Sequence, residues 1–172
     1  GEGNTRTVTL TNVTGTADSN NKISIRANAV KDAAGNGSSV VTSTAFTIKA
    51  KDTTRPSVVI SKPSPTTVEQ GGTVKYTVSF SDETAMGTVN FNNDYVALIG
   101  FTGNVSVSGT GNTRYVTISN VTGTADSDNK ITIRANAAKD AAGNGTVATN
   151  STTFTIVEPV KDTTRPSVVI SK

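Results

Sequence analysis

The side chains of this sequence that could do chemistry are its carboxylates and carboxamides. The sequence contains no histidine and no cysteine, which removes imidazole catalysis, thiol nucleophiles and the commonest ligands of zinc, copper and iron. Asp and Asn recur in short turns such as DAAGN at residues 140–144, a segment that is repeated at residues 32–36. Oxygen atoms of this kind are the ligands that calcium accepts.

The candidate metal ligands lie in three short segments: DTTRP at 52–56, FSDET at 80–84 and DAAGN at 140–144. In a β-sandwich with alternating strand directions, these segments meet at the end of the domain where its chain begins. Residues 14–21 (TGTADSNN) lie in a loop at the opposite end and would face the next domain along the chain. The sequence therefore predicts a calcium site at each domain junction, with the ligands Asp52, Asp82, Glu83, Asp140, Asn144 and Asp18.

The same residues also have an interpretation without a metal. Asp and Asn are good turn formers, Gly143 provides a positive φ angle, and Asn144 can bond its own backbone. The loop ADSDN at 125–129 lacks the glycine and the distal glutamate of an EF-hand, which favours an ordinary turn there. For DAAGN, the calcium ligand and the simple turn remain open alternatives.

The composition favours an all-β protein. The chain of 172 residues is 34% hydrophobic and 5% aromatic, and it is rich in Thr, Ser, Asn, Gly and Val, as expected for half-buried strands joined by turns. The net charge of +3 is spread along the chain without a basic cluster, so we expect no nucleic-acid partner. No apolar run is long enough to span a bilayer, and without His or Cys no catalytic constellation converges, so we expect no enzyme.

A long internal repeat gives the domain organisation. Residues 3–37 match residues 111–145 at 29 of 35 positions, and residues 51–62 are identical to residues 161–172. A period of about 110 residues is the size of one whole domain. We therefore predict three segments: the C-terminal part of an incomplete repeat (1–51), a complete repeat (52–161) and the first strand of a next repeat (162–172).

Strict alternation of apolar and polar residues predicts the strands of one repeat. It is clearest at residues 74–80 (VKYTVSF) and recurs at 114–121, 130–137 and 153–157. Residues 94–98 are the only candidate for a helical turn. About seven strands in one repeat favour a two-sheet Greek-key sandwich of immunoglobulin type. The residues expected to be buried are Val58, Ile60, Val74, Tyr76, Val78, Phe80, Val116, Ile118, Ile131, Ile133, Ala135, Phe154 and Ile156.

The order and spacing of DTTRP, FSDE and DAAGN resemble those of the bacterial immunoglobulin-like repeats of large surface adhesins, and the resemblance covers the whole chain. It implies a secreted, extracellular, non-catalytic tandem repeat on the bacterial cell surface that serves as a stalk or fibre and is stiffened by calcium. Its partners would be neighbouring repeats of the same or identical chains, with an unknown ligand at the tip. The alternative is an immunoglobulin-like module that binds a carbohydrate or a host surface.

Overall fold

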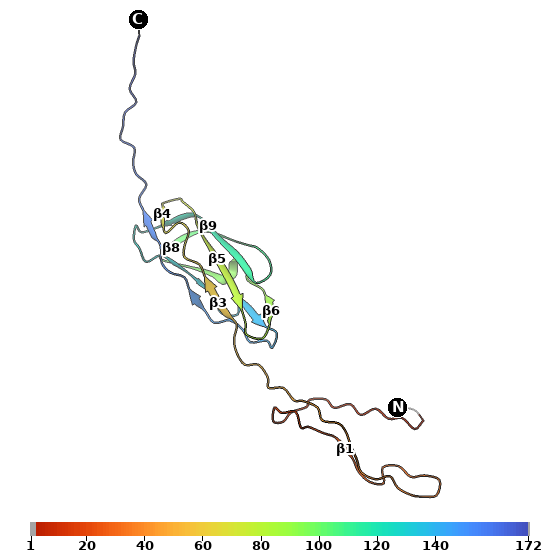
Figure 1. The fold of residues 1–172 in the computed structure, drawn as a ribbon. Coiled ribbons are helices and arrows are strands. Elements are labelled where there is room, and N and C mark those ends of the chain that lie inside the picture. The colour runs from red at the N-terminus through yellow and green to blue at the C-terminus, as the bar shows by residue number, and fades with distance from the viewer. Residues whose placement is uncertain (1–2, 172) are drawn as a thin grey trace. The chain divides into compact units, whose positions relative to one another are not determined.

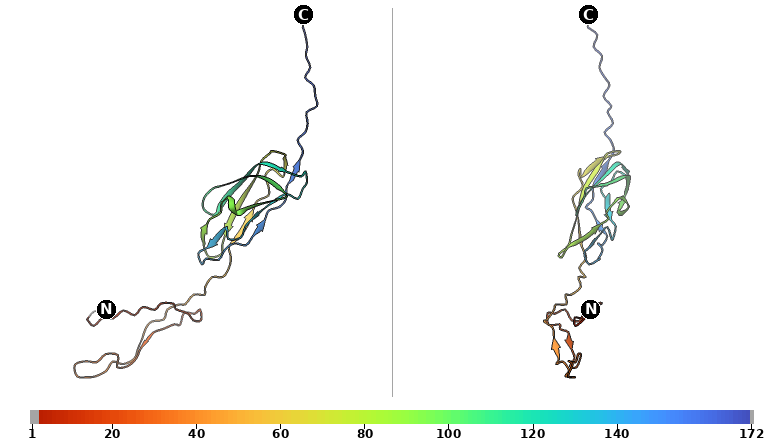
Figure 2. Two further views of the ribbon diagram at one scale, coloured as in Figure 1. Left: turned by 180° about the vertical axis from the view of Figure 1, so that it is seen from behind. Right: turned by 90° about the vertical axis from the view of Figure 1, so that its right-hand side faces the viewer.

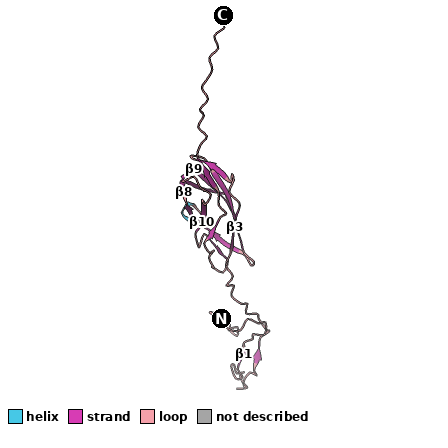
Figure 3. Cartoon of the chain, turned by 90° about the vertical axis from the view of Figure 1, so that its left-hand side faces the viewer, coloured by secondary structure: helices cyan, strands magenta, loops and turns pink. Residues whose placement is uncertain are grey.

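A computed structural model of the chain describes residues 3–171, so the outermost predicted positions, 1–2 and 172, lie outside the described residues. The chain divides into two units, Gly1–Lys51 and Asp52–Lys172. Strands occur in both units, and the one helix in residues 3–171 is a single 3-10 turn, η1 (Asn93–Tyr95) (Figures 1 and 3). No described helix is long and apolar enough to cross a membrane.

The largest sheet of the second unit has four antiparallel strands in the order β3-β5-β9-β8 (Figure 1). Strand β5 is central and pairs with β3 on one side and β9 on the other. Strand β9 therefore lies between β5 and β8, with hydrogen-bonding partners on both edges. The bounds of these strands are β3 (Ser57–Ile60), β5 (Val74–Ser81), β8 (Phe101–Ser108) and β9 (Thr113–Gly123).

Three smaller sheets complete the second unit. Figure 2 shows the strands of this unit in two further views. One has the order β12-β10-β7 and is antiparallel, one pairs β11 with β6 in antiparallel fashion, and one pairs β13 with β4 in parallel. The unit is therefore mostly β and is built from several small, mainly antiparallel sheets. The remaining bounds are β4 (Thr67–Glu69), β6 (Met86–Val89), β7 (Val96–Ile99), β10 (Lys130–Ile133), β11 (Ala138–Asp140), β12 (Thr149–Asn150) and β13 (Thr155–Val157).

One hydrophobic core joins these sheets. The alternation predicted for β5 is confirmed, because Val74, Tyr76, Val78 and Phe80 are buried while Lys75 between them is exposed. Side chains from β9, β10 and β13 belong to the same core, and Phe101 packs edge to face against Phe154. Each fully buried aliphatic side chain contributes about 1.5 to 3 kcal/mol, which a domain without disulfides needs. Val58 and Ile60 are partly buried against this core, and the other expected core residues are buried except Ala135.

The structure corrects the sequence prediction at two places. Ala135, expected to point inward, is exposed because β10 ends at Ile133 and Asn136 takes a positive φ of 62°. The helical turn expected at residues 94–98 lies at Asn93–Tyr95 instead, and the following residues form strand β7, which pairs with β10. In the second case the pairing of β7 with a distant strand determines where the helical turn ends.

The first unit contains little regular structure. Its strands β1 (Ser24–Ile25) and β2 (Val41–Thr42) form a two-residue antiparallel pair. Residues 5–15 match strand β9 in sequence but form no strand. Single bridges join Asn21 to Phe46 and Lys31 to Gly37.

Residues 162–171 repeat the sequence of residues 52–61 but form no strand here, and their assignment as the first strand of a next repeat stays a prediction. In the complete copy, the same sequence forms β3 because β5 provides its hydrogen-bonding partner. Val168, Val169 and Ile170 are almost fully exposed. An isolated strand has no partner for its backbone groups, so the sequence alone does not make it extended and paired.

Candidate metal site

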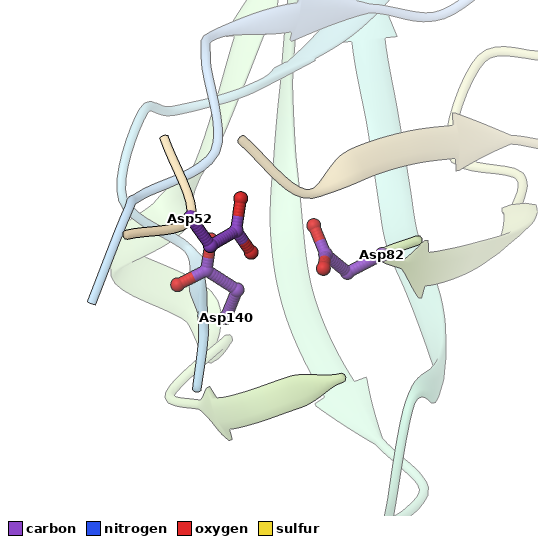
Figure 4. A group of neighbouring side chains, drawn as sticks. All are labelled: Asp52, Asp82 and Asp140. Carbon is purple, nitrogen blue, oxygen red and sulfur yellow. The ribbon is translucent and has the colours of Figure 1, made fainter. Parts of the chain in front are cut away.

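Three aspartates of the second unit come together at one end of its sheets (Figure 4). One carboxylate oxygen each of Asp52, Asp82 and Asp140 lies within 4.8 Å of the other two. Asp52 precedes β3, Asp82 follows β5 directly, and Asp140 is the last residue of β11. Residues from three segments that are far apart in the sequence are thus assembled by the pairing of β3 with β5 and of β11 with β6.

A glycine brings β6 close enough to position Asp140. The register between β11 and β6 shifts between Ala138 and Asp140, and the partner of Asp140 is Met86. A Cβ atom on Gly87 would lie 2.3 Å from the carbonyl oxygen of Asp140, a distance that real Cβ atoms do not reach. The backbone of the Asp140 turn therefore requires a glycine opposite to it.

Asn144 fixes the carboxylate of Asp140. The backbone N–H of Asn144 donates to Oδ1 of Asp140 at 2.8 Å, and its side-chain Nδ2 donates to Oδ2 at 2.7 Å. The same Nδ2 lies 3.1 Å from the carbonyl oxygen of Asp52, which connects the turn to the beginning of the unit. Asn144 thus hydrogen-bonds both the side chain of Asp140 and the backbone of Asp52.

These contacts keep Asp140 ionised although it is only 3% exposed. Burial raises the pKa of its carboxyl group, but the hydrogen bonds from Asn144 and from the backbone amides of the turn lower it, and the net pKa lies below the ordinary value of 3.8. At neutral pH the site therefore contains a buried carboxylate anion.

Thr84 connects Asp52 with Asp82. Its hydroxyl oxygen lies 2.7 Å from Oδ2 of Asp52 and 2.7 Å from Oδ1 of Asp82. A hydroxyl has one proton, so it donates to only one of these oxygens at a time. The backbone N–H of Thr84 also donates to Oδ1 of Asp82 at 2.9 Å, which leaves that oxygen well satisfied.

The second oxygen of Asp82 is the unsatisfied atom of the site. Oδ2 of Asp82 is buried and has no hydrogen-bonding partner. A buried carboxylate oxygen without a partner is unfavourable, and three carboxylates this close together repel one another. A cation at this position would relieve both effects. The three aspartates could therefore bind a metal ion, and their oxygen-only ligands suit a hard cation such as calcium, magnesium or manganese.

The structure separates the six predicted ligands into groups. It brings Asp52, Asp82 and Asp140 together and places Asn144 in contact with two of them. Glu83 is exposed and does not belong to the group of close carboxylates.

The sixth predicted ligand, Asp18, belongs to the first unit. Its Oδ1 accepts hydrogen bonds from the backbone of Asn20 and the side chain of Asn21. A role of Asp18 in metal binding stays a prediction.

Sequence reasoning missed Thr84. The signal that could have found it is the spacing Asp-x-Thr, in which the aspartate accepts from the backbone two residues later. The same local bond occurs from Thr54 to Asp52 and from Thr164 to Asp162. Only Thr84 also contacts a second aspartate from another segment.

Comparison of the chain with protein families, with curated proteins and with solved structures finds no match. What the chain does must therefore be inferred from its internal repeat and from the aspartate cluster.

Proposed function

We propose that the chain is a structural repeat, a spacer or fibre-forming unit of a bacterial extracellular adhesin-like protein. The support comes from the repeat, since near-identical copies in tandem favour uniform length and stiffness over a unique binding site. The β-rich second unit and the motifs that resemble adhesin repeats agree with this function.

The fold of each complete repeat is proposed to be an immunoglobulin-like Greek-key sandwich. Its support is the single core to which β5 and β9 of one sheet and β10 of another contribute. Two antiparallel sheets that share one core are the basis of a sandwich.

Calcium is the proposed ion. The observation that carries this is the cluster of Asp52, Asp82 and Asp140, in which a buried oxygen of Asp82 lacks any partner. Calcium binds six to eight oxygen atoms in irregular geometry and accepts carboxylates with one or both oxygens. Water and backbone carbonyls can complete such a set, and an ordered turn such as DAAGN presents its ligand without reorganisation.

Bound calcium would fasten the first residue of the unit to its sheets. Asp52 begins the unit, whereas Asp82 and Asp140 belong to the ends of β5 and β11. An ion shared among them restricts the path by which the chain enters the domain, because it binds the assembled arrangement better than the open one. Repeated at each junction, this would stiffen a stalk.

Calcium titration of the full chain by calorimetry tests the site. We expect binding by the parent chain and its loss in Asp82→Asn and in Asp140→Asn. The matched control is Asp32→Asn, because Asp32 lies in the same KDAAGNG sequence but outside the cluster, and this variant should bind like the parent. Absence of binding by the parent, or equal loss in Asp32→Asn, would refute the proposed site.

Small-angle scattering tests the stiffening separately. In millimolar calcium the full chain should scatter as a longer and narrower particle than in chelator, and Asp140→Asn should remove this difference. Identical scattering profiles in both conditions would exclude stiffening even if calcium binds.

A further inference from the structure

The second unit has a groove on its largest sheet that is not part of the aspartate cluster. The groove crosses β5 and β9 and borders the segment that follows β3. Its volume of about 340 Å³ falls within the range of small-ligand sites. Besides the core residues of the two strands, it is lined by Ser61, Ser64, Lys75, Thr77, Tyr115 and Thr117.

Two cross-strand pairs form the floor of this groove. Lys75 of β5 lies opposite Thr117 of β9, and Thr77 lies opposite Tyr115. These four floor residues alternate with buried residues, so their side chains point away from the core. Lys75 and Tyr115 are diagonal neighbours on this face, which places them about 7 Å apart.

The segment after β3 forms one wall of the groove and is fixed to β5. The backbone N–H of Ser61 donates to the carbonyl of Thr77 at 2.8 Å, and the N–H of Thr77 donates to the Ser61 hydroxyl at 2.9 Å. Ser64 and Lys75 exchange two backbone hydrogen bonds, at 3.0 Å and 2.9 Å. The groove is thus formed without a ligand, which lowers the free-energy cost of binding one.

Tyr115 gives the floor an accessible aromatic ring. Its side chain is 53% exposed. A Cβ atom on Gly109 would lie 3.2 Å from its ring carbon Cδ2, so the glycine leaves room for the ring on that side. An exposed ring among hydroxyl groups combines an apolar surface with polar neighbours.

Lys75 gives the groove its charge. It is exposed, and it is the only charged residue in the lining. Within residues 3–171, hydrogen bonds of the protein engage the Ser61 hydroxyl, but they engage no side chain of the four floor residues. The ammonium group and the floor hydroxyls are therefore available to a ligand.

We propose that this groove binds an acidic carbohydrate, through a sugar unit that carries a carboxylate. The C–H groups on one face of a sugar ring form an apolar surface, which suits the ring of Tyr115. Sugar hydroxyls exchange hydrogen bonds with the threonine hydroxyls of the floor. The ammonium group of Lys75 pairs with the carboxylate of the sugar, and no acidic residue of the lining competes for it.

The groove and the proposed calcium site are independent. Asp82 lies five residues beyond Thr77, at the far end of β5, which is about 17 Å at about 3.4 Å per residue. Carbohydrate binding on the side of the sheet therefore does not rest on the proposed function.

Titration of the full chain with trigalacturonic acid, followed by amide chemical shifts in NMR, tests the proposal. Chelator is present throughout, so that calcium cannot bridge the sugar and the aspartate cluster. Shifts should concentrate at residues 64, 75–77 and 115–117. The methyl ester of the same trisaccharide, which lacks the charges, should bind at least about fivefold more weakly. Absence of these shifts up to about 10 mM sugar, or equal affinity for the ester, would overturn the proposal.

Substitutions on the floor test the aromatic ring. Tyr115→Thr introduces the residue that the first unit has at this repeat position, Thr7, and threonine is a good strand former. This variant should bind trigalacturonic acid at least about fivefold more weakly. Tyr115→Phe keeps the ring and should bind like the parent. Parental affinity of Tyr115→Thr, in a protein that thermal denaturation shows to be folded, would contradict the proposed stacking.

A pair of lysine variants tests the charge. Lys75→Gln should weaken binding at least about fivefold. The matched control is Lys130→Gln, because Lys130 lies in β10 of another sheet and its substitution removes the same charge. The control should bind like the parent. Equal weakening in both variants would show attraction to the net charge of +3 alone, and the groove would then not be the site.

Discussion

Residues 28–37 and residues 136–145 differ only at the third position and fold locally in the same way. In each, the aspartate N–H bonds the carbonyl of the asparagine four residues later, at 3.0 Å and 3.1 Å. In each, a bridge joins the lysine before the aspartate to the glycine after that asparagine. The turn of this repeat is therefore determined by its own residues, without the rest of a domain.

The strands behave differently. Residues 113–123 form the eleven-residue strand β9, whereas residues 5–15 of nearly the same sequence form none. Strand β9 exchanges hydrogen bonds with β5 and β8, and the first unit has neither. The comparison teaches that alternation gives a segment the capacity to be a strand, while distant partners decide whether it becomes one.

The cluster of carboxylates depends on the strands and not on the turn alone. Asp32 and Asp140 have the same hydrogen bonds to the asparagine of their turn. Only Asp140 lies beside two other carboxylates, because β5 and β6 bring Asp82 and the close backbone contact at Gly87 to it. The cluster of three aspartates is thus a property of the complete repeat.

Truncation of one isoleucine in each copy should give the largest contrast. Ile133→Ala removes a fully buried side chain and should lower the free energy of unfolding by about 2 to 5 kcal/mol. Ile25→Ala, at the same position of the repeat, should change it by less than about 0.5 kcal/mol because Ile25 is half exposed. Urea denaturation followed by circular dichroism measures both, and equal losses would show that the first unit has a core in solution.

Gly87→Ala should break the contact that distinguishes the two turns. The new methyl group would overlap the carbonyl of Asp140, so the backbone must move, at a cost of about 1 to 3 kcal/mol. Calcium affinity should fall in the same variant because Asp140 is displaced. Thr88→Ala, at an exposed residue of the same strand, is the control and should leave both quantities unchanged. A Gly87→Ala protein with parental stability and affinity would contradict this close contact.

The sequence predicted the fold best where alternation was strict. The phase of β5 was correct because Val74, Tyr76, Val78 and Phe80 alternate with polar residues. Strand β7 (VALI) was missed, since four apolar residues in a row contain no alternation, and its identity as a strand comes from pairing with β10. Local pattern thus predicted the strands with strict alternation and missed β7, which has none.

The candidate site was predictable to a similar extent. Turn chemistry and strand order indicated that Asp52, Asp82 and Asp140 share one end of the domain. The exposure of Glu83 depends on which way the chain turns after β5, and its neighbour Thr84 contributes the contact instead. Such one-residue differences arise from tertiary packing, which a single sequence does not encode locally.

The two identical DTTRP segments allow a third comparison, between substitutions of Asp52 and of Asp162. We expect these to differ by about 1 kcal/mol in the free energy of unfolding. In chelator, Asp52→Asn should raise the free energy of unfolding by this amount, because it removes one charge from three that repel. In calcium, the same variant should be less stable than the parent, because a ligand is lost. Asp162→Asn, in the copy without a strand partner, should have no effect in either condition. Thermal denaturation in both buffers measures the stability of Asp52→Asn relative to the parent. If this variant is more stable than the parent in both buffers, or less stable in both, no cation binds at Asp52.

The smallest expected effect is a difference between the pKa values of Asp32 and Asp140, measured without calcium. Both Asp32 and Asp140 have a pKa below 3.8. For Asp32 the largest influence is the hydrogen bond from the Asn36 side chain, which lowers the pKa. For Asp140 the largest influence is burial, which raises the pKa. The hydrogen bonds from Asn144 and the backbone together outweigh this effect of burial. Asn36→Ala should therefore move the pKa of Asp32 upward toward its ordinary value. Asn144→Ala should also move the pKa of Asp140 upward, because burial then meets less opposition.

The sign of the pH dependence follows from these directions. In the parent, ionised Asp140 stabilises the fold above pH 3.8, and this contribution is lost as the pH falls through the lowered pKa of the folded state. In Asn144→Ala the folded-state pKa of Asp140 lies higher than in the parent, so this stabilising contribution becomes smaller. Carboxyl carbon chemical shifts followed by NMR from pH 2 to pH 6 measure both midpoints. An unchanged pKa of Asp140 in Asn144→Ala would show that the Asn144 side chain does not hold this carboxylate in its ionised form.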